Sequence, residues 1–484
     1  MITFICSIVL LIGGYFIYGT FVEKQFGADG NRKTPAYESE DGVDYVPMSW
    51  SKIFLIQFLN IAGLGPIFGA VLGAVYGPSA FIWIVLGSIF GGATHDYISG
   101  MMSLRNNGMS LPEIAGRYMG NGFKQLMRAF TLMLMILVGV VFVAGPAKLL
   151  ANMTPEVLDY TFWIITIFIY YILATILPID KLIGRIYPFF GFALLFMAVG
   201  IGISIFIQGA PIPEASLSNL HNMNADPDKF PIFPMLFISI ACGAISGFHA
   251  TQSPLMARCL KNEKQGRRVF YGAMIAEAIV ALIWAAAAMS FFGNVGGLQQ
   301  FLADNGNNAA VVVDKISHSW LGKFGGLLAI IGVIAAPITS GDTAFRSARL
   351  IVADFLKYKQ KKVINRIILS APIFIAGFFI LQVNFDVIWR YFAWSNQTLA
   401  AFTLWMITIY FVRMNKNYWI TLLPALFMTM VTTTYLIVAP EGFRLPLNYG
   451  YAIGFITTTS LLLCFAYWAT KLRKTESIKV NSNE

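Results

Sequence analysis

Charged residues are scarce in this sequence of 484 residues. Asp, Glu, Lys and Arg make up 12% of it and hydrophobic residues 57%, whereas about 25% of a soluble domain is charged. So little polar surface cannot cover a water-soluble fold, which excludes a soluble enzyme and a disordered protein. The apolar residues instead form runs of about twenty, the length of a helix that crosses a bilayer. The sequence therefore predicts an all-α polytopic membrane protein.

Nucleotide and zinc motifs are also missing. The sequence has no GxGxxG or GxxxxGK[ST] phosphate loop, which disfavours ATP-driven transport by this chain alone. It has no HExxH or similar spacing, so we expect no zinc. We also expect no other cofactor and no enzymatic activity. The four cysteines, Cys6, Cys242, Cys259 and Cys464, show no metal-ligand or redox spacing. We expect them to be buried small apolar residues.

Apolar runs provide about thirteen candidate membrane spans. They cover residues 2–22, 52–76, 78–103, 125–148, 160–178, 183–208, 232–257, 268–292, 324–345, 365–383, 387–412, 418–438 and 449–470. The first run has no basic residue before it and no cleavage site after it, so we expect it to be a retained helix.

The distribution of positive charge orients these spans. Lys and Arg are retained on the cytoplasmic side of a membrane, and 28 of the 34 lie in alternate connections and the C-terminal tail, with 6 on the opposite side. This split predicts a membrane protein with its N-terminus outside and its C-terminus in the cytoplasm. It also explains the net charge of +10 without nucleic acid as a partner.

Two of the spans are interrupted by residues that break helices. The second span contains the run Gly63–Pro66, and the seventh has small and polar residues from Cys242 to Pro254. Such stretches can serve close helix packing alone. However, the two lie five spans apart and run in opposite directions, as in a five-plus-five inverted repeat whose discontinuous helices meet at the bilayer midplane. We expect this core at 50–415, a peripheral helix and cytoplasmic loop at 1–49, and peripheral helices with a cytoplasmic tail at 416–484.

Four stretches of the sequence resemble the carbon starvation protein A family. They are Gly63–Gly69, Gly92–Tyr97, Cys242–His249 and Asp342–Arg349, of which the third is the most specific. The resemblance covers about residues 50–360. It implies a bacterial inner-membrane transporter of the amino acid–polyamine–organocation superfamily, with a LeuT-like five-plus-five inverted repeat. Members of the family are described as taking up peptides, or pyruvate with protons, when carbon is scarce.

Small and polar residues at the two breaks are the candidates for substrate binding. Helix N-termini at a break suit a carboxylate, and His249 directly follows the second break. The alternative is that His249 only satisfies carbonyls that the break frees. The candidates are Asn60, Gly63, Gly65, Ser246, Gly247, His249, Thr251 and Gln252.

Three ionisable residues at membrane depth are candidates for proton coupling. His95 and Asp96 are neighbours in the third span, and Glu277 lies in the middle of the eighth. A charge near the bilayer centre costs about 2.5–3.5 kcal/mol on insertion scales, so such residues are usually functional. The alternatives are structural, with Asp96 accepting hydrogen bonds from another helix and Glu277 anchoring one. Neighbours on a helix point about 100° apart, so we do not expect His95 and Asp96 to face one shared ligand.

Asp342 and Arg346 lie in a long helix expected over 324–357. Their spacing is that of an (i, i+4) ion pair. We interpret them as a gate on the cytoplasmic side, with retention of positive charge on that side as the alternative.

A sodium site is a further candidate, by analogy with the superfamily that the sequence resembles. There, a Ser/Thr pair at this place can bind sodium together with carbonyls of the first broken helix. The corresponding residues are Thr339, Ser340, Ile61 and Ala62. This is an analogy at the level of fold, and hydroxyls that bond to their own helix are the alternative.

Together these observations favour a secondary active transporter, a proton symporter, that imports peptides or pyruvate during carbon starvation. The alternatives are a nutrient sensor, which binds without moving cargo, and a channel. A membrane-embedded enzyme using His95, Asp96 and His249 is disfavoured because no metal or diphosphate motif accompanies them. The expected partners are a small-molecule substrate and the lipid bilayer.

Overall fold

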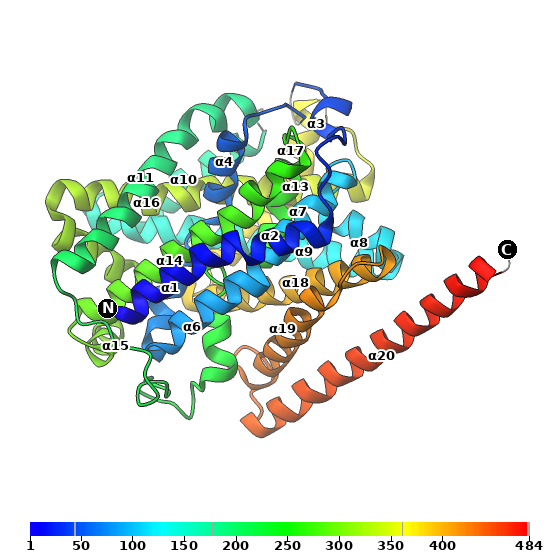
Figure 1. Cartoon of the computed structure of the whole chain (residues 1–484). Helices are drawn as coiled ribbons and strands as arrows, with labels where there is room; N and C mark the ends of the chain where they lie inside the picture. Colours follow the sequence, from blue (N-terminus) through cyan, green and yellow to red (C-terminus); the bar gives the residue numbers. More distant parts are fainter. Residues whose placement is uncertain (43–44, 177–178, 361, 482–484) are drawn as a thin grey trace.

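The computed structural model describes residues 1–42, 45–176, 179–360 and 362–481, and it is built from helices (Figure 1). Across these residues there is no β-strand, and one isolated bridge joins Met48 to Leu260. The elements, with short π or 3-10 segments marked η, are α1 (Ile2–Phe16), α2 (Tyr18–Phe26), α3 (Pro35–Glu38), α4 (Trp50–Ile61), η1 (Gly65–Gly69), α5 (Ala70–Gly73), η2 (Ala74–Tyr76), α6 (Ser79–Leu86), η3 (Gly87–Gly92), α7 (Ala93–Arg105), α8 (Leu111–Met119), α9 (Asn121–Met153), α10 (Tyr160–Ile176), α11 (Ile179–Ile207), η4 (Ile232–Leu236), α12 (Phe237–Ser239), α13 (Gly247–Ala257), η5 (Glu263–Gln265), η6 (Arg267–Tyr271), α14 (Gly272–Phe291), α15 (Val295–Asp304), α16 (Ala309–Leu356), α17 (Val363–Ile380), α18 (Phe385–Arg413), α19 (Trp419–Val438) and α20 (Leu447–Asn481).

In the described part of the chain, nine helices are long and apolar enough to cross a membrane, and one bent pair would make a tenth span. The other three predicted spans correspond to α10, whose apolar part is short, to the interrupted segment 232–257, and to α18. Residues 177–178, where one predicted span ends, lie outside the described residues. The multi-pass helical architecture is therefore confirmed, and the number thirteen stays a prediction.

The first predicted break is present in the structure. α4 ends at Ile61, and Ala62 has non-helical dihedral angles (φ −78°, ψ 53°). The chain resumes at Gly65, and the two halves are bent by 56°. Pro66 lies in the first turn of the new segment, where its missing N–H removes no intrahelical bond.

The second predicted break is also present. Helical structure stops at Ser239 and begins again at Gly247. Residues 240–246 between them are non-helical, with ψ of 75° at Ile240 and φ of −146° at Ser246. This stretch has the small residues that the sequence pattern indicated, which pack closely without needing a continuous helix.

The two breaks lie against each other inside the bundle. A Cβ atom built on Gly65 would be 2.4 Å from the side chain of Cys242, and one built on Gly69 would be 2.8 Å from the carbonyl oxygen of Ser239. Only glycine permits so close an approach. The predicted convergence of the two interruptions is thus confirmed.

Long helices surround this junction. α14 and α16 pack on η1, α18 packs on α13, and α9 contacts both α16 and α18. The C-terminal helix α20 packs on α19 and extends away from the other helices (Figure 1). The expectation that all four cysteines are buried is wrong for Cys6 on α1 and Cys464 on α20, which are exposed. Both helices present apolar side chains outward, where a bilayer supplies the apolar surroundings.

The segment between α2 and α4 is fastened to the core. Arg105, at the end of α7, donates two hydrogen bonds to the buried carboxylate of Glu263, at 3.1 and 2.9 Å. The same carboxylate accepts a bond of 2.8 Å from the backbone N–H of Asp29. Farther along, the N–H of Met48 donates to the carbonyl of Cys259 at 3.1 Å. This segment is therefore bound to the connection that follows α13, and Glu263 in that connection also binds the end of α7.

Candidate functional site at the two broken helices

Three ionisable side chains from three helices form a continuous chain of contacts. Asp96 lies on α7, His249 in the first turn of α13 and Glu277 on α14. Oδ2 of Asp96 is 2.8 Å from Nδ1 of His249, and Nε2 of His249 is 3.3 Å from Oε2 of Glu277. All three are fully buried. A buried charge is tolerated only when it is paired, and here an imidazole lies between the two carboxyl groups.

His95 extends this chain on the side of α7. Its Nδ1 is 2.8 Å from Oδ1 of Asp96, and its Nε2 is buried without a hydrogen-bond partner among the described residues. The two neighbours therefore contact each other, and Asp96 is the shared partner of both histidines. We call His95, Asp96, His249 and Glu277 the buried network. It contains every residue predicted for proton coupling, and that role stays a prediction.

Asn396, on α18, binds both sides of the second break. Its Oδ1 accepts a hydrogen bond of 2.8 Å from the backbone N–H of Phe248 and one of 3.1 Å from Oγ of Ser246. Its Nδ2 donates to Sγ of Cys242 at 3.4 Å. The amide thus caps the first turn of α13 from a neighbouring helix. Asn396 is not among the substrate-binding candidates, but its place beside Gln397 inside an apolar span predicted that it lines the cavity or joins helices by hydrogen bonds.

The other substrate-binding candidates also lie buried at the breaks. Thr251 donates to the carbonyl of Phe248 at 2.6 Å, and Nε2 of Gln252 donates to Oγ1 of Thr251 at 2.9 Å. Oε1 of Gln252 and Oδ1 of Asn60 are buried without a hydrogen-bond partner in the described part of the chain. The buried candidates are Asn60, Gly63, Gly65, Ser246, Gly247, His249, Thr251 and Gln252.

The predicted sodium-site residues connect α16 to the first broken helix. Oγ of Ser340 is 3.0 Å from the carbonyl of Leu59 and 3.0 Å from that of Ala336, and Oγ1 of Thr339 is 2.7 Å from the carbonyl of Ala336. The hydroxyls thus bond back to their own helix, which was the alternative, and one also reaches α4. That contact is at Leu59, before Ile61 and Ala62, and a role in sodium binding stays a prediction.

The predicted gate residues connect α16 to α10. The hydroxyl of Tyr170 donates to Oδ2 of Asp342 at 3.0 Å, and a guanidinium nitrogen of Arg346 donates to the carbonyl of Ala174 at 2.6 Å. Both side chains are buried. The residues therefore link two helices of the bundle, and a role in gating stays a prediction.

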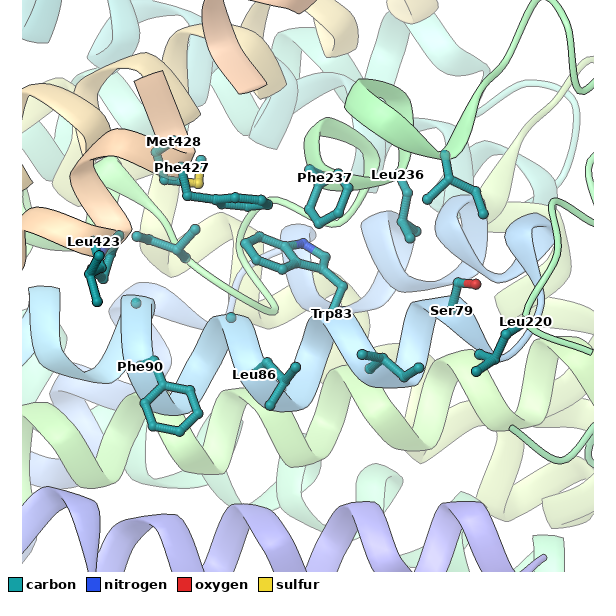
Figure 2. Close-up of a pocket in the computed structure, with 16 residues that line it drawn as sticks. Ser79, Trp83, Leu86, Phe90, Leu220, Leu236, Phe237, Leu423, Phe427 and Met428 are labelled. Atoms are coloured by element: carbon teal, nitrogen blue, oxygen red, sulfur yellow. The ribbon is translucent and has the colours of Figure 1, made fainter. Parts of the chain in front are cut away.

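An apolar groove of about 580 Å³ lies beside the second break (Figure 2). Its walls come from α6 and η3, from the segment before the break and from α19, and its side chains include Trp83, Phe237 and Phe427. The indole N–H of Trp83 donates to the carbonyl of Ile240 at 3.0 Å. The groove thus touches the break through Trp83, but its apolar lining gives a carboxylate nothing to bind.

A protein-family comparison matches most of the chain. The model of the carbon starvation protein CstA family matches residues 1–158, 148–320 and 291–435. An uncharacterized membrane protein of Haemophilus influenzae is 44% identical over 351 residues, which are 63% of this chain and 94% of that protein.

Two relatives with functional names are more distant. The peptide transporter CstA of Campylobacter jejuni is 28% identical, with 88% of this chain and 78% of that protein covered. The pyruvate/proton symporter BtsT of Escherichia coli is 25% identical, with 89% and 80% covered.

The fold is similar to that of the crystal structure of MhsT in complex with L-phenylalanine. The TM-score is 0.54 at 14% sequence identity, over 85% of this chain and 99% of that one. This similarity supports the LeuT-like fold expected from the sequence. The chain is therefore a multi-pass membrane protein that belongs to the carbon starvation protein CstA family.

Proposed function

We propose that this protein is a secondary active transporter that imports small carboxylate-bearing solutes, peptides or pyruvate, with protons across the bacterial plasma membrane. The observation that carries the proposal is the meeting of two broken helices in the bundle interior, beside a buried network of ionisable groups. The printed names of two relatives, a peptide transporter and a pyruvate/proton symporter, support it.

The broken helices supply the binding chemistry. The first turn of α13 leaves backbone N–H groups that favour an anion, and the carboxamide oxygen of Asn396 lies there at 2.8 Å from the N–H of Phe248. A substrate carboxylate offers the same kind of acceptor with a full charge. We propose that it takes this position, near His249 and Ser246.

Acceptor atoms at the breaks favour a substrate with N–H groups. Oδ1 of Asn60 and Oε1 of Gln252 are buried without a hydrogen-bond partner among the described residues, and leaving buried acceptors unpaired costs about 1–3 kcal/mol each. A peptide has an ammonium group and amide N–H groups that can satisfy them, whereas pyruvate has no such donor. On this ground we favour peptides as the substrate class.

The inverted repeat provides the proposed mechanism. Residues 50–415 would form two five-span halves, with peripheral segments 1–49 and 416–484, the N-terminus outside and the C-terminus in the cytoplasm. Rocking of one bundle against the other around the two breaks would open the site to each side in turn. Asp342 and Arg346 would close it on the cytoplasmic side.

Protons are the proposed coupling ion. This part of the proposal rests on the symporter among the relatives, and not on the protonation of any one of His95, Asp96 or Glu277. Sodium, held by Thr339, Ser340 and carbonyls of the first broken helix, is the competing ion.

Reconstituted uptake tests the proposal. The full chain in proteoliposomes should accumulate a labelled dipeptide or labelled pyruvate above the outside concentration under an imposed proton gradient, and not under a sodium gradient of equal size. Accumulation under the sodium gradient alone would show that sodium, and not the proton, is the coupling ion. Flux without saturation or accumulation would identify a channel, and saturable binding without flux a sensor; either result would refute a symporter.

A further inference from the structure

Three side chains of types that can bind a metal ion converge at the second break. Cys242 lies in the non-helical stretch, His249 in the first turn of α13 and Glu277 on α14. One ligand atom from each lies within 4.8 Å of the other two, and all three residues are buried. Spacing along the sequence gave no sign of this cluster, because it forms only when the break folds against α14.

The orientation of His249 leaves one ring nitrogen available as a ligand. Its Nδ1 is 2.8 Å from a carboxylate oxygen of Asp96, so an N–H at this position makes that hydrogen bond. In the neutral imidazole, Nε2 then presents a lone pair towards Glu277, 3.3 Å away. A carboxylate that binds the far nitrogen of a metal-bound histidine is a recurrent arrangement, because it fixes the tautomer and the direction of the ring.

The atoms that face one another here lack hydrogen bonds. Nε2 of His249 and both carboxylate oxygens of Glu277 are buried without a hydrogen-bond partner among the described residues. Two groups with lone pairs directed at each other need an electron-pair acceptor between them, which is either a proton on Nε2 or a metal ion. A metal ion is such an acceptor, and Sγ of Cys242 lies within reach of the same point.

We propose that Cys242, His249 and Glu277 bind a divalent transition-metal ion of the zinc type. Thiolate, imidazole and carboxylate are its usual protein ligands, and three of them leave the fourth tetrahedral position open. Calcium and magnesium prefer oxygen ligands alone, so a site with sulfur and nitrogen discriminates against them. The amide of Asn396, 3.4 Å from Sγ of Cys242, can donate a hydrogen bond to the sulfur.

A bound ion would fasten the second break to α14. The break contributes Cys242, α13 contributes His249 and a separate helix contributes Glu277, so one ion would tie together segments that must separate if the site is to open. Binding of the ion does not depend on the proposed transport function. If that function is correct, the ion should also slow uptake.

Cobalt binding to the purified full chain tests the site directly. After removal of any affinity tag and of bound metal, Co²⁺ should bind with a stoichiometry near one and produce the thiolate-to-cobalt absorption band that only a cysteine ligand gives. Cys242→Ser should abolish this band, and Glu277→Gln should weaken Co²⁺ binding at least tenfold. Cys259→Ser is the matched control, because Cys259 is also buried but lies outside the cluster, and it should bind as wild type does.

Three outcomes would overturn the inference. They are the absence of the band in the wild-type chain, an unchanged band in Cys242→Ser, and equal loss in Cys259→Ser. Glu277 lies on α14 and Cys242 in the non-helical stretch, so if one variant fails to give a monodisperse protein, the other still tests the site. Excess Mg²⁺ should not displace Co²⁺, whereas Zn²⁺ should. A chain that binds Co²⁺ in this way but takes up neither dipeptide nor pyruvate would keep the metal site and refute the transport proposal.

Discussion

Gly247→Ala should separate α13 from α18 at the second break. A Cβ on residue 247 would lie 2.5 Å from the backbone nitrogen of Ala400 and 2.6 Å from the carbonyl oxygen of Asn396, whereas ordinary contacts begin at 3.4 Å. These neighbours are backbone atoms of one helix and cannot turn aside, so the helices must part by about 1 Å. Overpacking of this kind costs about 1–3 kcal/mol.

The same displacement should break the cap on α13. The bond from the N–H of Phe248 to Oδ1 of Asn396, 2.8 Å long, would lengthen to about 3.8 Å, beyond hydrogen-bond range. Loss of such a cap costs about 0.5–2 kcal/mol. Together the two effects predict destabilisation by about 1.5–5 kcal/mol and, because the proposed carboxylate position moves with α13, at least tenfold weaker uptake.

Thermal unfolding in detergent and uptake in proteoliposomes measure these effects. Gly122→Ala in α9 is the control, because a Cβ there meets nothing within 4 Å; it should be neutral or slightly stabilising. If Gly247→Ala unfolds at the wild-type temperature and transports at the wild-type rate, the close packing of α13 on α18 described above is wrong.

Three further changes test other parts of the structure. Trp83→Phe removes the donor to the carbonyl of Ile240 and should cost about 1–3 kcal/mol in unfolding experiments; the exposed Trp419→Phe should cost nothing measurable. Glu263→Gln removes the charge that binds Arg105 and the backbone N–H of Asp29, so a protease should cut residues 27–42 several-fold faster. An unchanged rate of cleavage would contradict the conclusion that Glu263 holds this segment against the core. Burial tends to raise the pKa of Glu113, but hydrogen bonds from Lys124 and Arg128 outweigh it and lower that pKa below its usual value. The free energy of folding that these ion pairs contribute is present above about pH 4.3 and is lost as acid protonates the folded carboxylate. Wild type should therefore be more stable than Glu113→Gln at pH 7 and lose that advantage towards pH 3. A stability difference that stays constant with pH would argue against the ion pairs.

Local sequence chemistry was enough to locate the breaks. Pro66 with its neighbouring glycines, and the small residues directly after Cys242, are weak helix formers, so both interruptions could be predicted from the chain alone. The approach of the two breaks to each other was predicted from the expected topology, because spans five apart would meet at the centre of an inverted repeat.

The partners of each side chain could not be predicted in the same way. Asp96 and His249 are 153 residues apart in the chain, and only the packing of α7 on α13 brings them together. The sodium analogy likewise selected Ile61 and Ala62, whereas the hydroxyl of Ser340 reaches the carbonyl of Leu59. Register between helices depends on side-chain packing along their whole length, and a sequence motif does not contain that information.

The core predicted at 50–415 is held in place partly by the segment between α2 and α4, which lies outside it. The backbone N–H groups of Asp29 and Met48, in this segment, bond to Glu263 and Cys259 in the connection that precedes α14. A chain shortened to residues 50–415 would therefore lose contacts that hold this connection in place. A rearrangement that moves this connection would have to break these contacts, so residues that precede the predicted core would help to set its rate.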